Sequence, residues 1–159
     1  KTVRCTVRDM WIRLVTTFFF TGDFPVAPGT VASFAGLLLA VILMPFPVVY
    51  ILVFAVVTIL GLTHSGAMEK ILGRKDPGCI VIDEVSGIML SLFLLPPTAP
   101  VLWTAFFLFR AFDMFKIWPA NRFESIGGGV GVMTDDLVAG LYTNLTMHAA
   151  LYFSASIGF

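Results

Sequence analysis

The chain has 159 residues, of which 58% are hydrophobic, 14% aromatic and 13% charged, with a mean hydropathy of +0.94. A soluble domain carries about 25% charged residues, so we expect a single membrane-embedded domain over residues 1–159 rather than a globule in water. Ten Lys and Arg balance ten Asp and Glu, and this argues against a nucleic-acid partner because there is no basic excess to contact phosphates.

The first of three charged segments, Lys1–Asp23, is expected to lie at the membrane interface (residues 1–23). Its apolar part, Trp11–Phe20, is short and contains Arg13. These features favour an interfacial amphipathic helix over a signal peptide. The other two charged segments run from Glu69 to Glu84 and from Arg110 to Asp136, and each of the three contains at least three basic residues.

Between and after these segments lie three stretches without Asp, Glu, Lys or Arg: Phe24–Met68, Val85–Phe109 and Leu137–Phe159. The first is interrupted by Pro45-Phe46-Pro47 and the second by the prolines of Pro96–Pro100. Proline cannot continue a helix without losing a hydrogen bond, so both breaks predict turns. The pattern predicts two helical hairpins followed by one further helix long enough to cross a membrane.

If both breaks are hairpin tips, all three charged segments lie on one face of the membrane, and their basic residues make that face cytoplasmic. Tyr50 and Trp103 would then lie at the far interface. The arms Val31–Met44 and Val85–Leu95 are shorter than a full crossing. We therefore expect an all-α integral membrane protein, a single bundle of transmembrane and re-entrant helices with its charged loops on one face. The alternative, one kinked span over Val85–Phe109, would put the second and third segments on opposite faces.

Carboxylates are concentrated in the second and third charged segments. Neighbouring carboxylates repel, and a bound divalent cation such as Mg²⁺ would relieve that repulsion. Two of the pairs also suit helix N-termini, so a capping role stays open for them. The acids concerned are Glu69, Asp76, Asp83, Glu84, Asp113, Glu124, Asp135 and Asp136.

Arg110, Asp113 and Lys116 recur every third residue and are expected on one helical face. The row offers a carboxylate for a metal beside two cations for a phosphate group, although an intrahelical ion pair is an equal alternative.

Several smaller features could bind phosphate or could be structural. The backbone N–H groups of Gly128 and Gly129 could converge on an anion, or the glycines could form a flexible connection. Thr30 could cap a helix or reach a phosphate. His64 suits a structural role or a place near the acids, and His148 is expected to hydrogen-bond a neighbouring helix.

Taken together, these motifs resemble the phosphatidylglycerophosphatase A family. They occur in the family's order, from about Phe18 to Tyr142. The motifs are PGTVAS (28–33), His64 with Glu69, IVIDEVSG (80–87), FRAFDMFK (109–116) and GGVGVMTDDLVAG (128–140). The resemblance implies a Mg²⁺-dependent, multi-pass phosphatase of the bacterial inner membrane. It would act on phosphatidylglycerophosphate at the cytoplasmic face and release phosphatidylglycerol for phospholipid biosynthesis.

The resemblance leaves the mechanism open, and the residues themselves favour a metal route. The sequence contains neither a Cys-x5-Arg loop nor an Asp-x-Asp pair to form a covalent phosphoenzyme. A water molecule activated at a metal is then the expected nucleophile, with Asp83 and Glu84 as catalytic candidates, Glu84 preferred as the general base, and His64 protonating the leaving oxygen. The expected metal ligands are Asp83, Glu84, Asp113, Asp135, Asp136 and Glu69, and the expected substrate contacts are Arg110, Lys116, Thr30, Gly128 and Gly129.

Two other functions remain open at this stage. An ion-transporting subunit would use the carboxylates along a permeation path, and a structural membrane subunit would use them as helix caps. The oligomeric state is left open.

Overall fold

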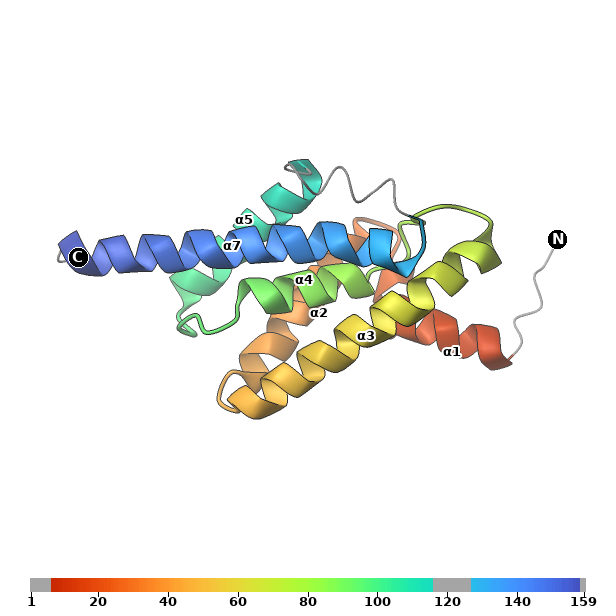
Figure 1. Cartoon of the computed structure of the whole chain (residues 1–159), viewed down its shortest axis with the longest axis horizontal. Helices are drawn as coiled ribbons and strands as arrows, with labels where there is room; N and C mark the ends of the chain where they lie inside the picture. Colours follow the sequence, from red (N-terminus) through yellow and green to blue (C-terminus); the bar gives the residue numbers. More distant parts are fainter. Residues whose placement is uncertain (1–6, 116–126, 158–159) are drawn as a thin grey trace.

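The computed structural model describes residues 7–115 and 127–157, and the regular elements in these ranges are helices (Figure 1). The all-α prediction is therefore confirmed for this part of the chain. The elements are α1 (Val7–Thr16), a short 3-10 turn η1 (Thr21–Asp23), α2 (Pro28–Leu43), α3 (Pro47–Leu72), α4 (Ile82–Ser91), α5 (Ala99–Phe115) and α7 (Gly129–Ile157).

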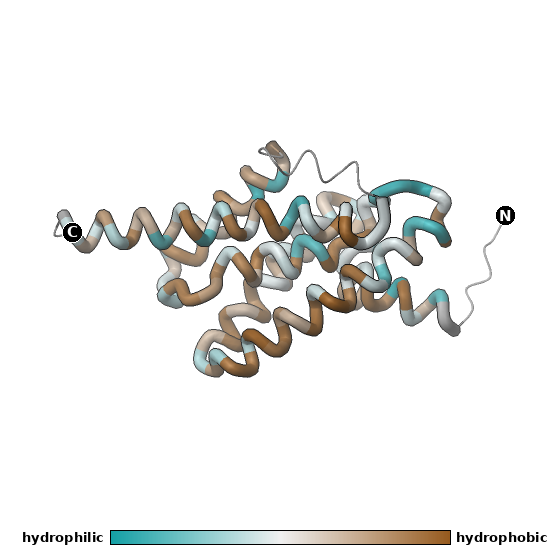
Figure 2. Tube along the Cα trace, in the orientation of Figure 1, coloured by the Kyte–Doolittle hydropathy of each residue, from teal (hydrophilic) through white to brown (hydrophobic). Residues whose placement is uncertain are grey.

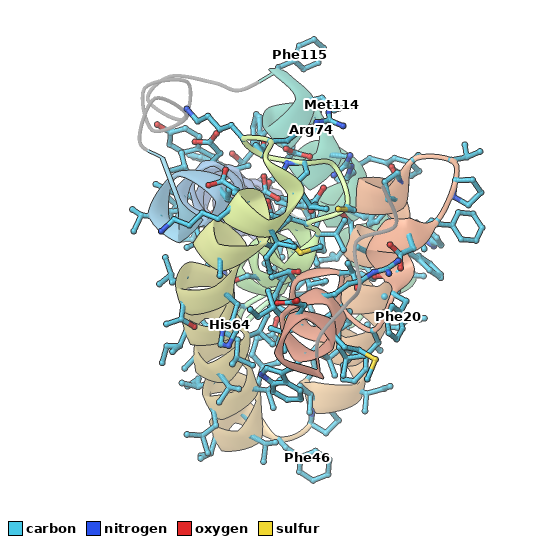
Figure 3. All side chains as sticks on the ribbon, turned by 90° about the vertical axis from the view of Figure 1, so that its right-hand side faces the viewer. Phe20, Phe46, His64, Arg74, Met114 and Phe115 are labelled. Atoms are coloured by element: carbon cyan, nitrogen blue, oxygen red, sulfur yellow. The ribbon has the colours of Figure 1, made fainter. Side chains whose placement is uncertain are left out.

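The chain turns at both predicted proline breaks. Residues 44–46 separate α2 from α3, and residues 92–98 separate α4 from α5. Both turns line one cavity of about 220 Å³, to which they contribute Pro45 and Pro97. The two hairpin tips therefore meet. Figure 3 shows Phe46 at one end of the molecule and Arg74 and Met114 at the other, so the second and third charged segments approach the same end, as the hairpin arrangement predicts.

Hydropathy follows the same axis. Figure 2 shows hydrophilic segments gathered where α3 ends and α4 begins, whereas the α2–α3 hairpin is mostly hydrophobic. Within the described ranges, α3 is the helix that is long and apolar enough to cross a membrane, and α2 is a shorter apolar helix.

The short helix α4 forms the centre of the bundle. Eight of its ten residues are buried, and α2, α3, α5 and α7 all pack against it. A helix that ends inside a protein leaves backbone carbonyl groups without partners. Here Asn144 in α7 donates its side-chain N–H to the carbonyl of Phe93 at 2.8 Å, and His148 Nε2 lies 3.2 Å from the same oxygen. His148 thus contacts the turn that follows α4, whereas a hydrogen bond to a neighbouring helix was predicted.

Tyr50 lies near the same end of α4 and lines the cavity at the two hairpin tips. Its side chain is 4% exposed, and its hydroxyl donates to the carbonyl of Met89 at 2.5 Å. The hydroxyl satisfies a carbonyl near the end of α4, so Tyr50 is held inside the bundle instead of at a surface.

Glycine lets α4 and α7 pack backbone to backbone. A Cβ atom on Gly87 would lie 2.7 Å from the carbonyl oxygen of Asp136, and one on Gly140 would collide with the carbonyl of Gly87. Small residues at a helix crossing allow such close approach. The crossing brings the Asp136 backbone against α4, about one helical turn beyond Asp83 and Glu84.

Candidate metal centre

Three carboxyl groups meet where α4 and α7 cross. Asp83 and Glu84 lie in the first turn of α4, and Asp136 lies about two turns into α7. One oxygen of each lies within 4.8 Å of the other two. This spacing allows the three oxygens to share one cation, and carboxylate oxygens are the ligands that hard divalent cations prefer.

The three groups face a small cavity of about 130 Å³, called the acidic cavity below. Its walls come from α4, α5, α7 and the segment between α3 and α4. The lining residues are Asp76, Gly78, Ile80, Asp83, Glu84, Asp113, Val132, Asp135 and Asp136. Five of the six predicted metal ligands thus line one cavity, although they come from three helices.

The trio is buried, and part of its hydrogen-bonding capacity is unused. Asp83 and Asp136 are 7% and 5% exposed. Asp83 Oδ1, Glu84 Oε2 and Asp136 Oδ2 are buried and accept no hydrogen bond from the described residues. A buried carboxylate oxygen without a partner is costly. A divalent cation would satisfy all three atoms, so the residues present fit a metal.

Burial raises the pKa of each of the three carboxyl groups. For Asp83, desolvation is the largest cause, and the charges of Glu84 and Asp136 raise its pKa further. For Asp136, desolvation again comes first, followed by the charge of Asp113, while Arg110 opposes the rise in pKa. A cation among these groups would favour their ionised forms.

Arg110 in α5 is the basic residue beside the trio. Its Nη1 donates to Asp113 Oδ2 at 2.6 Å and to Ser33 Oγ in α2 at 3.4 Å. The predicted row on α5 therefore contains the ion pair that the sequence suggested, and the pair is held next to the acidic cavity. Pairing with one carboxylate leaves other guanidinium N–H groups for a phosphate oxygen.

Gly29, at the start of α2, leaves room for the side chains of Glu84 and Arg110. A Cβ atom there would collide with Glu84 Oε1 and lie 3.5 Å from Arg110 Nη1. The position is buried, so no larger side chain fits without moving the Glu84 carboxylate. Sequence reasoning selected the neighbouring Thr30 and missed Gly29.

Glu69 lies apart from the trio. Its Oε1 accepts the backbone N–H of Asp76 at 2.8 Å, and its Oε2 accepts that of Gly128 at 3.0 Å. Both Glu69 oxygens thus accept hydrogen bonds from backbone N–H groups instead of facing the acidic cavity. The Gly128 N–H points at Glu69, and Gly129 begins α7 against the Leu62 carbonyl.

The alternative interpretation of the acid pairs as helix-start residues holds for one of the two pairs, because Asp83 and Glu84 lie in the first turn of α4. The N-cap of α4 is Val81, and no side chain caps it. Thr134 and the two aspartates after it do not open a helix, because α7 begins at Gly129 and the Thr134 hydroxyl donates to the Val130 carbonyl at 2.6 Å. The cap interpretation of this second pair is therefore wrong. Of the glycines predicted to be a connection, Gly129 opens α7 and Gly128 precedes it.

Two further predicted residues, Thr30 and His64, are not brought to the cavity. Thr30 is exposed in the first turn of α2. His64 Nδ1 lies 2.8 Å from Thr63 Oγ1 and 3.0 Å from the Leu60 carbonyl of its own helix; Figure 3 places His64 on α3 between its Phe46 and Arg74 ends. Lys116 falls outside the described residues.

One acidic residue that lines the cavity was not among the predicted metal ligands. Asp76 lines the acidic cavity, and its φ of 43° is left-handed. The signal available in the sequence was its place before Pro77 in an acid-containing loop between two predicted helices.

Comparison with known proteins agrees with the motifs. Residues 14–151 match the model of the phosphatidylglycerophosphatase A family. The chain is 34% identical over 142 residues to phosphatidylglycerophosphatase A of Escherichia coli K12, covering 87% of this chain and 81% of the relative. It is 33% identical over 145 residues to the protein of that name from Haemophilus influenzae, covering 89% of each.

A third relative carries a different name. The chain is 36% identical over 150 residues to a Bacteroides thetaiotaomicron protein named for a proposed phosphatidylinositol-3-phosphatase activity, covering 86% of this chain and 91% of the relative. No solved structure matches the chain.

Proposed function

The chain belongs to the phosphatidylglycerophosphatase A family, and we propose that it hydrolyses phosphatidylglycerophosphate to phosphatidylglycerol and inorganic phosphate at the acidic cavity. The observation that carries the proposal is the buried trio of Asp83, Glu84 and Asp136, with an unpartnered oxygen on each. Such a trio binds a cation, and a cation beside Arg110 is a site for a phosphate group.

Asp83, Glu84 and Asp136 are the proposed ligands of Mg²⁺, with Asp113 and Asp135 at the rim of the same cavity. Bound Mg²⁺ would neutralise phosphate charge and lower the pKa of a coordinated water. The small volume of the cavity suits the phosphate group alone: at about 130 Å³ it is smaller than the ~300–1,000 Å³ pockets that enclose whole small molecules. The glycerol and acyl chains of the lipid then lie outside it.

The protein residues bind the phosphate and remove a proton. Arg110, fixed by Asp113 and Ser33, donates to phosphate oxygens. Glu84 is the proposed general base, because it is the more exposed member of the trio. Its carboxylate accepts the proton of the attacking water as the water oxygen bonds to phosphorus and the bond between phosphorus and the glycerol oxygen breaks. The Glu84 carboxyl then returns this proton to the leaving glycerol oxygen. His64 is given no role in protonating the leaving oxygen, because its ring faces its own helix.

We place the acidic cavity at the cytoplasmic face of a bacterial inner membrane. Support comes from the apolar α2–α3 hairpin and from the two hairpin tips, which meet at the end opposite the cavity. In this arrangement α4 is a re-entrant helix. Its polar first turn meets the interface, and its last carbonyls are satisfied by Tyr50, Asn144 and neighbouring groups. The product supplies phospholipid biosynthesis.

Neither rival function matches the placement of the acids. An ion-transporting subunit needs ionisable groups spaced along a path through the membrane, whereas these carboxylates converge on one small cavity. A structural subunit with acids as helix caps would have its aspartates at the start of α7, and they lie about two turns inside it.

The names of the relatives suggest two different lipid phosphomonoesters as substrates. A direct assay can show which of the two this chain hydrolyses. Purified protein is incubated in mixed micelles with phosphatidylglycerophosphate or phosphatidylinositol 3-phosphate, with Mg²⁺ or with EDTA, and released phosphate is measured. We expect Mg²⁺-dependent release that favours phosphatidylglycerophosphate. Faster release from the inositol lipid would reassign the substrate, and equal release in EDTA would remove the metal from the proposal.

A further inference from the structure

A second cavity, called the apolar groove here, lies between α1, α2 and α3. Its volume is about 330 Å³, and every residue that lines it is apolar. They include Trp11 from α1, Leu39 from α2, Val53 and Leu60 from α3, and Ile82 from α4. A groove without polar groups offers nothing to a sugar, a nucleotide or a peptide backbone, so its occupant must be hydrocarbon.

The groove runs along α3. Its lining positions 53, 56, 57 and 60 are spaced by three and four residues, so they form one stripe about 10 Å long. At one end, Ile82 packs near Gly61 and directly precedes Asp83 of the trio. The stripe extends from there towards Val53 and the Pro47 end of the helix. The groove therefore starts at the depth of the acidic cavity and leads into the apolar half of the protein.

The groove is open on one side. Val56 and Trp11 line it and are each 54% exposed. Val56 lies on the helix best suited to cross a membrane, where an exposed apolar side chain faces lipid at no hydrophobic cost. The hollow is too small for a partner helix, which is about 10–12 Å across, whereas a single hydrocarbon chain can lie along it.

We propose that the apolar groove binds one acyl chain of the lipid substrate, and so holds the molecule while its phosphate occupies the acidic cavity. The proposal rests on the proposed function for the identity of the lipid. An acyl chain in a micelle is already out of water, so the groove adds little to overall affinity. What it adds is selection by length and shape, because a chain that does not match the groove leaves it partly filled or extends beyond it.

The test is competition between chain lengths. Phosphatidylglycerophosphates with dodecanoyl to octadecanoyl chains are mixed in one micelle preparation, and the relative kcat/KM of each species is measured by mass spectrometry of the products. Wild type is expected to prefer one length. Val56→Trp narrows the groove and should shift the preference to shorter chains, changing the ratio of longest to shortest by about tenfold. Leu39→Ala enlarges it and should shift the preference the other way.

The matched control is Ile59→Trp. Ile59 is on the same helix and is similarly exposed, at 58%, but it does not line the groove. This variant should keep the wild-type length profile, and the thermal unfolding of all variants is followed to confirm that they fold. A second readout needs no turnover: a phosphatidylglycerol with a diazirine in its acyl chain should crosslink to residues 53–60 and 11–19.

The possible outcomes distinguish a failure of the groove proposal from a failure of the proposed phosphatase function. If Val56→Trp and Leu39→Ala keep the wild-type length profile, or if the crosslinks fall elsewhere, the groove proposal is wrong while wild-type turnover still supports the phosphatase. If wild type releases no phosphate from any of these lipids, the proposed function fails, and the crosslinks alone decide whether the groove binds an acyl chain.

Discussion

Glu69, near the end of α3, accepts the backbone N–H of Gly128 at 3.0 Å across 59 residues of sequence. The other oxygen of the same carboxylate accepts the backbone N–H of Asp76 at 2.8 Å. Asp76 belongs to one wall of the acidic cavity, and Gly128 precedes α7, which supplies another wall. One carboxylate thus joins the two segments that must be aligned for Asp136 to meet Asp83.

Replacing Glu69 by Gln should loosen both walls. Glutamine keeps one acceptor oxygen but presents an N–H₂ group to the second backbone N–H, so one hydrogen bond is lost and a donor is left facing a donor. We expect a loss of about 1–2 kcal/mol of stability, with weaker Mn²⁺ binding and a kcat that recovers at high metal concentration. The exposed neighbour Lys70→Gln is the control. A kcat that stays low at saturating metal would instead make Glu69 a ligand.

Removing one charge of the trio should stop turnover without unfolding the protein. Asp83→Asn and Asp136→Asn keep the side-chain size and remove a metal ligand, so kcat should fall by about a hundredfold or more. Mn²⁺ binding, measured by electron paramagnetic resonance, should weaken in parallel. Asp23→Asn is the matched control, because Asp23 pairs with Arg13 on the surface. Wild-type rates in the Asp83/Asp136 double variant would end the metal hypothesis.

Gly29→Ala tests the packing under Glu84. The added Cβ would meet Glu84 Oε1, so the carboxylate must move away from the trio. Because the obstacle is the end of a flexible side chain, we expect a small change in Tm but roughly a tenfold loss of kcat. Gly127→Ala adds the same methyl group where nothing lies within 4 Å and should leave the rate unchanged. Equal effects of the two substitutions would contradict the role given to Gly29.

The raised pKa values of the trio predict how stability depends on pH without metal. Each carboxyl is more readily protonated in the folded chain than in the unfolded chain, so the folded state binds more protons. The contribution of the trio to stability in EDTA should therefore be full below the ordinary carboxyl pKa and fall as the pH rises from there towards the raised values. The loss is about 1.4 kcal/mol for every pH unit over which one carboxyl stays protonated in the folded chain alone.

Added Mg²⁺ should reverse this loss, because a cation stabilises the ionised carboxylates. Thermal unfolding followed by tryptophan fluorescence at pH 5 and pH 8 would measure it. We expect Mg²⁺ to raise Tm more at pH 8 than at pH 5, and we expect the Asp83→Asn/Asp136→Asn double variant to lose most of this difference. A metal-induced rise in Tm that is the same at both pH values would show that the trio does not titrate as a unit with the metal.

The sequence alone determined the helical elements and the chemistry of the site. Proline cannot continue a helix, so the breaks at residues 44–46 and 92–98 could be placed from composition. The arm at Val85 was predicted to be shorter than a full crossing, and α4 is indeed short. Asp83, Glu84 and Asp136 could be selected from the sequence because they stand in recognisable motifs and because a carboxylate can bind a metal wherever it lies.

Only the tertiary structure decided which of the acids work together. Asp136 joins Asp83 and Glu84 because Gly87 and Gly140 let two backbones touch, and sequence spacing contains no crossing angle. Glu69 was assigned with the metal ligands because a carboxylate looks the same whether it faces a cation or two backbone N–H groups. The partner of Tyr50 could not be predicted for a similar reason, since it is a carbonyl near the end of α4. Local sequence specifies the groups that a side chain offers, whereas its partners are set by contacts between segments that are distant in the chain.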